Sequence, residues 1–243
     1  MVQKRSSGSV LEQLLGHILV REVFVFHFMK IDPDSREPDN LKKIIRKRIQ
    51  KKRGKLSECA RFTRSTSIAD RLMGLGCYKD SKEILAYYPF RSEIDTTIII
   101  RRALEQQKKV ILPRVNGKDL DLYYIKDLSN DLNPGTFDIM EPIPSECTPA
   151  SYKDIDIVLV PGVSFDRDLN RLGYGGGFYD KLLEKLPAYL LRIALAFDLQ
   201  IVDNIPVMEH DLKVDIIITE TETIASSHNK TNPIKEITDT KGS

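Results

Sequence analysis

A short apolar run followed by a glycine-rich loop constrains the fold more than any other part of the chain. Residues 155–160 read IDIVLV, which is typical of a strand buried on both faces of a sheet. The loop at residues 171–180 reads RLGYGGGFYD and leads into a segment with helical spacing. In open α/β sheets, ligands bind at the carboxyl ends of the strands. The pattern therefore predicts a layered α/β domain with a binding loop at that edge.

The rest of the chain alternates between helix and strand patterns. Helices are expected at residues 41–53, 57–75, 93–107 and 178–185. Strands are expected at residues 84–88, 110–112, 120–125, 155–160, 192–197 and 214–218, with 120–125 a candidate for antiparallel pairing. This order predicts an α/β fold: a single three-layer domain with a mainly parallel, Rossmann-like sheet flanked by helices.

Composition divides the 243 residues into three parts. Residues 1–40 mix apolar and charged side chains and end in a proline-broken polar stretch. We expect them to be an N-terminal extension that is either disordered or artefactual: with Met29 as the biological start, residues 1–28 would be a reading-frame artefact. Residues 41–220 are expected to form the domain, and residues 221–243 a polar tail.

Charge and cysteine usage limit the class of protein. Residues 41–55 hold nine Lys or Arg and no acid, whereas the remainder holds 28 basic and 35 acidic side chains. The three cysteines are scattered and odd in number, which argues against a disulfide framework and favours a reducing compartment. No uninterrupted apolar stretch approaches the ~18 residues that span a bilayer. We therefore expect a cytoplasmic protein that does not bind membranes.

The glycine-rich loop has the features of an anion site. Four glycines within residues 173–177 let backbone N–H groups converge, and the following helix adds further N–H groups and the positive end of its dipole. The loop has neither the G-x-x-x-x-G-K-[ST] order of a Walker loop nor the spacing of a dinucleotide fingerprint. A tight structural connection is the alternative. The residues alone therefore predict an anion loop without specifying which anion it binds.

The loop, together with PGVSFD before it, resembles the signature of the 5-formyltetrahydrofolate cyclo-ligases, also called methenyltetrahydrofolate synthetases. The likeness extends to LKKIIRKRIQ, AYYPFRSEIDT, KKVILPRV, IMEP and PVMEHDLKVDIIIT, which occur in family order from about residue 41 to residue 219. The resemblance implies an enzyme that converts 5-formyltetrahydrofolate to 5,10-methenyltetrahydrofolate with ATP and Mg²⁺, and that releases ADP and phosphate. ATP would phosphorylate the formyl oxygen before intramolecular ring closure, a reaction that depends on positioning and charge neutralisation.

The resemblance also implies roles for residues of the basic segment and of the loop near residue 90. Lys42 and Arg46 match the ATP-contacting pair of the family and lie four residues apart, on one helical face. The other Lys and Arg of this segment are interpreted as a solvated basic face, and the lack of aromatic residues there argues against nucleic-acid binding. Glu93 matches the folate-binding glutamate, although the residues alone favour an acid in the first turn of a helix. Tyr88 either stacks on the folate ring or packs at the end of a strand.

The remaining site residues come from the loop and from the closing segment. The loop matches the ATP-contacting residues Arg171, Leu172, Gly173, Tyr174, Gly175, Gly176, Gly177, Phe178 and Tyr179. Substrate contacts are implied for Tyr174, Gly175, Gly176, Gly177 and Phe178. Catalytic roles are implied for Arg171 and Asp180, and magnesium ligation for Asp180 and Asp211. The family often has Lys at the position of Gly176, and Tyr174 stands at a variable position. His210 is expected to be structural or to support the site without binding the metal itself, since no second histidine lies nearby to complete a metal pair.

Other functions remain open at this level. A sugar-phosphate isomerase or an acyltransferase on a similar sheet would also use an anion loop, without ATP or the two aspartates. A non-enzymatic folate- or nucleic-acid-binding protein would use the basic segment alone, and its DNA binding would depend on salt. The leading hypothesis is a cyclo-ligase that acts as a monomer or weak dimer on 5-formyltetrahydrofolate, with or without a polyglutamate tail.

Overall fold

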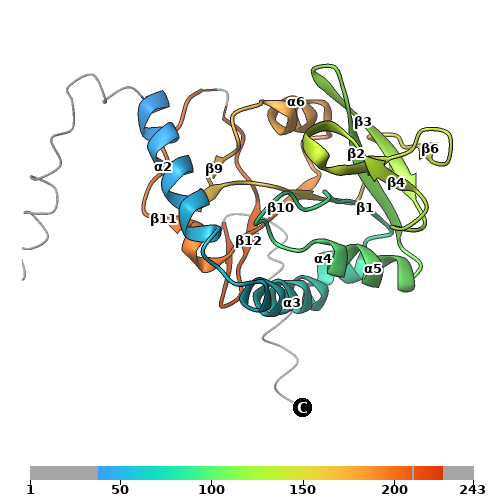
Figure 1. Cartoon of the computed structure of the whole chain (residues 1–243), viewed down its shortest axis with the longest axis horizontal. Coiled ribbons are helices and arrows are strands. Elements are labelled where there is room, and N and C mark those ends of the chain that lie inside the picture. Colours follow the sequence, from blue (N-terminus) through green and yellow to red (C-terminus); the bar gives the residue numbers. More distant parts are fainter. Residues whose placement is uncertain (1–37, 210, 227–243) are drawn as a thin grey trace, which may run out of the picture.

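The chain forms a mixed eight-stranded sheet between two layers of helices (Figure 1), as its computed structural model shows for residues 38–209 and 211–226. The strand order is β13-β12-β10-β7-β1-β2-β3-β6. The five strands from β12 to β2 are parallel, whereas β13, β3 and β6 pair antiparallel at the two edges. The expected α/β architecture with a mainly parallel sheet is therefore confirmed.

The helices and strands have the following bounds. The α-helices are α2 (Pro38–Arg53), α3 (Glu58–Gly74), α4 (Gly76–Asp80), α5 (Thr97–Glu105) and α6 (Phe178–Lys185). The main sheet contains β1 (Glu83–Leu85), β2 (Lys109–Asn116), β3 (Asp119–Ile125), β6 (Thr148–Pro149), β7 (Ile157–Val160), β10 (Leu191–Leu195), β12 (Ile216–Ile218) and β13 (Thr223–Ala225). Two small sheets contain β4 (Leu132–Pro134) with β5 (Met140–Pro142), and β8 (Ser164–Asp166) with β9 (Arg171–Leu172) and β11 (Ile201–Val202). Short 3₁₀ turns lie at η2 (Thr136–Asp138) and η3 (Asp198–Gln200).

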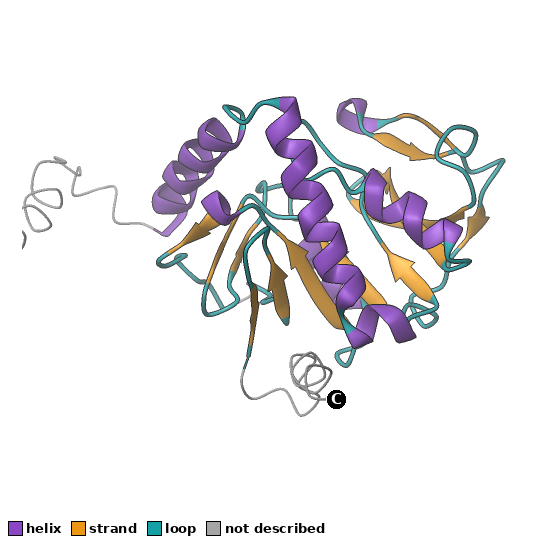
Figure 2. Ribbon diagram, turned by 90° about the horizontal axis from the view of Figure 1, so that it is seen from below, coloured by secondary structure: helices purple, strands orange, loops and turns teal. Residues whose placement is uncertain are grey.

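Alternation along the strands separates two cores. In β1, Ile84 packs with α3, α4 and α5 on one face of the sheet, whereas Leu85 packs with α6 on the other. Successive side chains of a strand point to opposite faces, so a strand buried on both sides feeds both cores. Figure 2 shows α3 and α5 lying across the strands on the first face. All four residues of β7 are buried, as the IDIVLV run predicted.

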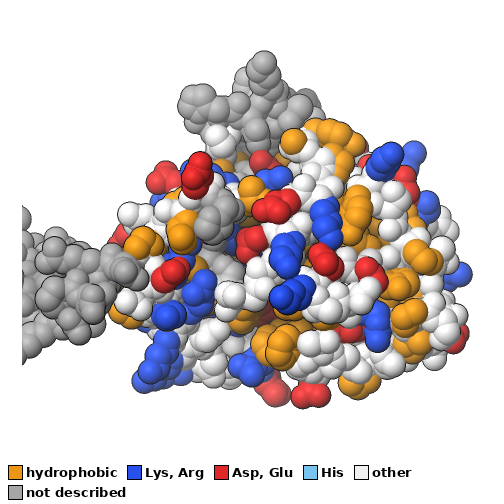
Figure 3. Space-filling view, turned by 90° about the horizontal axis from the view of Figure 1, so that it is seen from above, with side chains coloured by type: hydrophobic (Ala, Val, Ile, Leu, Met, Phe, Trp, Pro, Cys, Tyr) orange, Lys and Arg blue, Asp and Glu red, His pale blue; other side chains and the backbone are white. Residues whose placement is uncertain are grey.

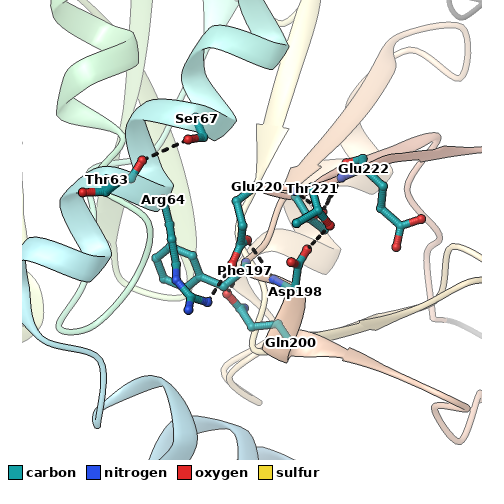
Figure 4. Close-up of polar contacts among 10 residues, drawn as sticks. Thr63, Arg64, Ser67, Phe197, Asp198, Gln200, Glu220, Thr221 and Glu222 are labelled. Atoms are coloured by element: carbon teal, nitrogen blue, oxygen red, sulfur yellow. Dashed lines mark hydrogen bonds and ion pairs between the residues drawn. The ribbon is translucent and has the colours of Figure 1, made fainter.

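A polar cluster fastens α3 to the loops at one edge of the sheet (Figure 4). Arg64 of α3 donates to Glu220 Oε1 at 2.7 Å, and the Asp198 backbone N–H donates to Glu220 Oε2 at 2.9 Å. The Thr221 hydroxyl donates to Asp198 Oδ1 at 2.9 Å. These bonds hold the loops after β10 and β12 against the helix layer.

Several expected elements differ from the observed ones. The strand expected at 84–88 ends at Leu85, and the helix expected from residue 93 begins only at Thr97. Between the strand expected at 155–160 and the helix expected at 178–185, where no strand was expected, lie β8 and β9. Residues 38–40 already belong to α2, and residues 223–225, expected in the tail, form β13. Residues 1–37 of the expected extension and residues 227–243 of the expected tail lie outside the described residues.

Candidate functional site

A cavity of about 410 Å³ lies where the segments after β1, β7 and β9 meet. Its walls come mainly from residues 87–93, from residues 137–141 and from the loop that ends in α6. Since β1 and β7 are parallel neighbours, their carboxyl ends meet at one edge of the sheet. The cavity therefore occupies the edge at which ligands of open α/β sheets bind.

The glycine-rich loop forms one wall of the cavity and leads directly into α6. Gly175 has φ +99° and Gly177 has φ +71°, a left-handed region that residues with a Cβ rarely adopt. Gly177 is the residue before the first turn of α6, so the N-terminal N–H groups of this helix face the loop. Gly176 has no such φ, and a Cβ there would lie 3.1 Å from the Phe178 ring. The position that often carries Lys in the family can thus accept a side chain with a small shift of that ring.

The α2 helix brings basic side chains to this loop. Figure 3 shows Lys and Arg side chains gathered near α2. Arg46 donates from Nε to the Gly173 carbonyl at 2.8 Å. Lys42 is buried and forms a 2.5 Å ion pair with Asp211, whose carboxylate also accepts from the Met208 N–H. Of the predicted ATP-contacting pair, Arg46 therefore contacts the glycine-rich loop, whereas Lys42 contacts Asp211.

Arg171 lies at the base of the loop, largely buried. Its guanidinium donates to the Pro161 carbonyl and forms an ion pair with Asp180 of α6. Burial lowers the pKa of Arg171, while the negative charges of Asp180 and Asp211 act in the opposite direction. Both aspartates therefore lie within electrostatic reach of one guanidinium, although they are far apart in the sequence.

Glu93 is buried against the cavity, in the loop between β1 and α5. Its Oε2 accepts from the Phe90 backbone N–H at 2.9 Å, and its Oε1 accepts from the Tyr174 hydroxyl at 2.6 Å. Burial raises the pKa of Glu93, against the lowering effects of the Tyr174 hydrogen bond and of the charge of Arg53. Glu93 precedes α5 by four residues, so its interpretation as a first-turn helix acid is wrong.

The predicted residues fall into two groups by position. Those that line the cavity are Tyr88, Glu93, Arg171, Gly173, Tyr174, Gly175, Gly176, Gly177, Phe178, Tyr179 and Asp180. Lys42, Arg46, Leu172 and Asp211 are not among the lining residues, and Leu172 is buried in β9. The Tyr179 hydroxyl is buried without a hydrogen-bond partner in the described part of the chain. His210 lies outside the described residues.

Three site residues were not singled out from the sequence. Phe90 and Glu141 line the cavity, and Arg53 lies behind it in contact with Tyr174. The interpretation of Arg53 as part of a solvated basic face is wrong, since its exposed fraction is 2%. Its position carried a signal, because the buried residues of α2, Lys42, Ile49 and Arg53, are spaced by seven and four residues and so share one helical face.

The carboxylates near the loop have the chemistry to bind magnesium. Asp180 and Asp211 supply carboxylate oxygens within electrostatic reach of Arg171, and Mg²⁺ takes one or two carboxylates together with phosphate oxygens and waters. The donor chemistry therefore fits the ion. Within residues 38–209 and 211–226, no group of three or more His, Cys, Asp or Glu could hold a metal by itself.

No helix in this part of the chain is both long and apolar enough to cross a bilayer.

Comparisons with known proteins identify the family of this chain from its sequence and its fold. A family model described as the 5-formyltetrahydrofolate cyclo-ligase family matches residues 38–220. A 5-formyltetrahydrofolate cyclo-ligase of Haemophilus influenzae is 31% identical over 180 residues, covering 72% of this chain and 95% of that protein. The mouse protein of the same name is 29% identical over 192 residues, covering 75% of this chain and 95% of its own.

Solved structures agree with these relatives. The NMR structure of 5,10-methenyltetrahydrofolate synthetase from Aquifex aeolicus superposes with a TM-score of 0.69 at 33% identity, covering 79% of this chain and 99% of that one. A 5,10-methenyltetrahydrofolate synthetase from Mycoplasma pneumoniae gives a TM-score of 0.59 at 25% identity, covering 74% and 98% of the two chains.

Proposed function

The chain belongs to the 5-formyltetrahydrofolate cyclo-ligase family, and we propose that it converts 5-formyltetrahydrofolate to 5,10-methenyltetrahydrofolate with ATP and Mg²⁺, releasing ADP and phosphate. The observation that carries this proposal is the shared cavity. A buried carboxylate that can bind a ring with N–H donors and a glycine-rich anion loop line the same space. A reaction between a folate and a triphosphate needs both in reach of each other.

The proposed reaction proceeds in two steps. The formyl oxygen attacks the γ-phosphorus of ATP, so an O–P bond forms, the bond to ADP breaks, and a phosphorylated formyl group results. The N10 nitrogen of the folate then attacks the formyl carbon, its proton is lost, and phosphate leaves with the former formyl oxygen. An amide-like oxygen is a poor leaving group, whereas phosphate is a good one. The protein therefore has to position two ligands and neutralise charge.

For the folate, we assign recognition to Glu93 and Tyr88. An ionised carboxylate accepts paired N–H donors such as those of a pterin ring, and charge-assisted bonds of this kind are the stronger ones. The Phe90 N–H and the Tyr174 hydroxyl hold the two oxygens of Glu93 at the cavity wall. Tyr88 lines the same cavity and offers an aromatic face for stacking.

For the nucleotide, we assign binding to the loop from Arg171 to Tyr179 and to the basic face of α2. The loop supplies backbone N–H groups, Arg46 supplies positive charge in contact with it, and Lys42 supplies positive charge next to Asp211. Arg171 contacts Asp180 at the cavity wall and is assigned to stabilising charge on the transferred phosphoryl group. Asp180 and Asp211 would hold Mg²⁺, which supplies charge neutralisation for the phosphates when it is bound.

The setting of the reaction is part of the same proposal. We infer a cytoplasmic protein that acts as a monomer or weak dimer, without nucleic acid or membrane, on folates with or without a polyglutamate tail. The scattered, odd set of cysteines supports a reducing compartment. Light scattering of the purified protein tests the oligomeric state. A gel shift with DNA that depends on salt would show that the protein does bind nucleic acid.

The activity is tested by mixing purified protein with 5-formyltetrahydrofolate and MgATP and following the near-ultraviolet absorbance band of the methenyl product. The proposal predicts a rising band that requires both ATP and Mg²⁺. A flat trace with folate binding still measurable by calorimetry would instead identify a folate-binding protein on a cyclo-ligase scaffold. A flat trace without binding would overturn the assignment of the cavity as well.

A further inference from the structure

A buried arginine lies behind the cavity with no assigned role in the reaction. Arg53, the last residue of α2, is 2% exposed. Its guanidinium donates from Nη2 to the Tyr174 hydroxyl at 2.5 Å and from Nε to the Ser92 hydroxyl at 3.1 Å. Removing a cation from water is costly, so a buried arginine needs a compensating interaction.

The compensating interaction runs through Tyr174 to Glu93. The Tyr174 hydroxyl accepts from Arg53 and donates to Glu93 Oε1 at 2.6 Å, so one oxygen atom joins the cation to the carboxylate. The tyrosine ring is held as well, edge-on to the Phe90 ring with centroids 5.9 Å apart. Three segments distant in the sequence, namely α2, the glycine-rich loop and the loop before α5, are thereby linked at one point.

Burial disfavours the charge of Glu93, whereas its two hydrogen bonds and the charge of Arg53 favour it. Besides Arg53, the titratable groups that face it are the phenols of Tyr87, Tyr174 and Tyr179, which are neutral at physiological pH. The net effect raises the pKa of Glu93: burial raises it, while the Tyr174 hydrogen bond, the charge of Arg53 and the Phe90 N–H lower it. A carboxylate that becomes protonated can no longer accept two N–H donors from a ring. Arg53 is thus the one cation among these groups that favours the ionised form.

We propose that Arg53 is a positioning residue which, through the Tyr174 hydroxyl, keeps Glu93 ionised and oriented toward the cavity. The inference rests on the proposed function only for the identity of the ligand that Glu93 receives. The Arg53–Tyr174–Glu93 chain itself is a property of the ligand-free protein, so it can be tested without substrate.

The test is a pH titration of the Glu93 carboxyl by ¹³C NMR in the ligand-free full chain, with the signal assigned by its loss in Glu93→Gln. Arg53→Met removes the charge from a long side chain, and Tyr174→Phe removes only the linking hydroxyl. Each is expected to raise the titration midpoint of Glu93 by about one pH unit, a tenfold change in proton affinity. The double variant should shift it little further, because both changes break the same chain.

Two further variants make the result decisive. Arg48 is exposed on the same helix, so Arg48→Met makes the same chemical change without touching the chain and should leave the midpoint unchanged. Arg53→Lys keeps the charge and should therefore shift the midpoint less than Arg53→Met does. It also replaces Arg53→Met in the test if that variant fails to fold. A midpoint that stays at the wild-type value in folded Arg53→Met or Tyr174→Phe protein would overturn the proposal, as would additive shifts in the double variant.

Folate binding separates this inference from the proposed function. In the wild type, affinity for 5-formyltetrahydrofolate should fall as the pH drops through the Glu93 midpoint, and Arg53→Met should move this fall to higher pH. The dissociation constant for ATP should change less than twofold in the same variant. Wild-type protein that binds no folate would contradict the proposed function, whereas the NMR midpoints would still decide the role of Arg53.

Discussion

Two buried glutamates lie near opposite ends of β1, and each accepts a hydrogen bond from a tyrosine hydroxyl. Glu83, the first residue of the strand, receives the Tyr124 hydroxyl at 2.5 Å and pairs directly with Lys109 at 2.6 Å. Glu93, in the loop after the strand, receives the Tyr174 hydroxyl, and its cation lies one hydroxyl further away. The Lys109 side chain is 65% exposed, whereas Arg53 is almost completely buried.

The difference separates a structural pair from a site. Glu83 and Lys109 are register partners in adjacent strands, and the ammonium group stays in water, so the pair ties β1 to β2 at low cost. Glu93 lines the cavity, and its charge is maintained at a distance. An ion pair made directly with Arg53 would occupy the carboxylate, whereas a cation behind a tyrosine leaves it able to receive a ligand.

The largest expected contrast lies in turnover. Asp180→Asn removes a charge that pairs with Arg171 and that is assigned to Mg²⁺, so we expect kcat to fall by about 10³-fold with the fold intact. Asp119→Asn is the matched control, because its carboxylate pairs with Lys185 at the other end of the same helix, on the surface. Steady-state assays over a range of Mg²⁺ concentrations check both variants. Turnover above a tenth of wild type in Asp180→Asn would remove the metal assignment.

The next contrast lies in folate affinity. Glu93→Gln loses two charge-assisted acceptor bonds, so the dissociation constant for 5-formyltetrahydrofolate should rise about 10- to 100-fold. Glu83→Gln makes the same substitution at the other end of β1 and should leave the constant unchanged. Calorimetric titration of both variants measures the difference. Equal affinities in the two would show that Glu93 has no special place in folate binding.

For the free energy of unfolding, unlike for folate affinity, Glu83→Gln should have the larger destabilising effect of the two variants. Glu83→Gln weakens the bond from Tyr124 and the pair with Lys109, so the free energy of unfolding should fall by about 1–2 kcal/mol.

The pKa of Glu93 is raised in the folded state, so its contribution to stability is present at low pH and is lost as the pH rises through that pKa. Glu93→Gln does not titrate, so its stability relative to wild type should increase over the same pH range. Urea unfolding from pH 4.5 to pH 8 follows both changes, and a relative stability that falls with pH would refute this reading.

The smallest expected effect concerns the glycine-rich loop. Gly176→Lys introduces a cation at a position with an ordinary φ, so we expect KM for ATP to fall by about two- to fivefold with little change in kcat. Gly177→Ala is the informative contrast, because φ there is +71° and the change should cost about 1 kcal/mol of stability. An unchanged KM in Gly176→Lys would indicate that the added ammonium group does not reach the phosphates.

The sequence predicts most of the sheet and less of the site. The helix at Phe178–Lys185 and the antiparallel pairing of β3 follow from local patterns, because periodicity and turn residues decide them. Residues 86–88 were expected in a strand and residues 93–96 in a helix, but tertiary contacts hold the backbone there instead. The Thr96 hydroxyl, for example, donates to the Tyr87 carbonyl at 2.6 Å.

The role of single charges could be predicted only in part. Lys42 and Arg46 were identified through the family motif, whereas Arg53 looked like its solvated neighbours in a run of basic residues. Only the position of Arg53 on the face of α2 that holds Ile49 distinguishes it, and the depth of that face depends on the loop packed against it. The pairing of Asp211 with Lys42 spans 169 residues, and no local pattern encodes such a contact.

The most direct test of the proposed reaction follows the formyl oxygen itself. 5-Formyltetrahydrofolate labelled with ¹⁸O at the formyl group is turned over with MgATP, and the released phosphate is analysed by mass spectrometry. Phosphorylation of that oxygen followed by ring closure predicts one ¹⁸O atom in each phosphate and one phosphate for each methenyl product. Methenyl product accompanied by unlabelled phosphate would contradict phosphorylation of the formyl group.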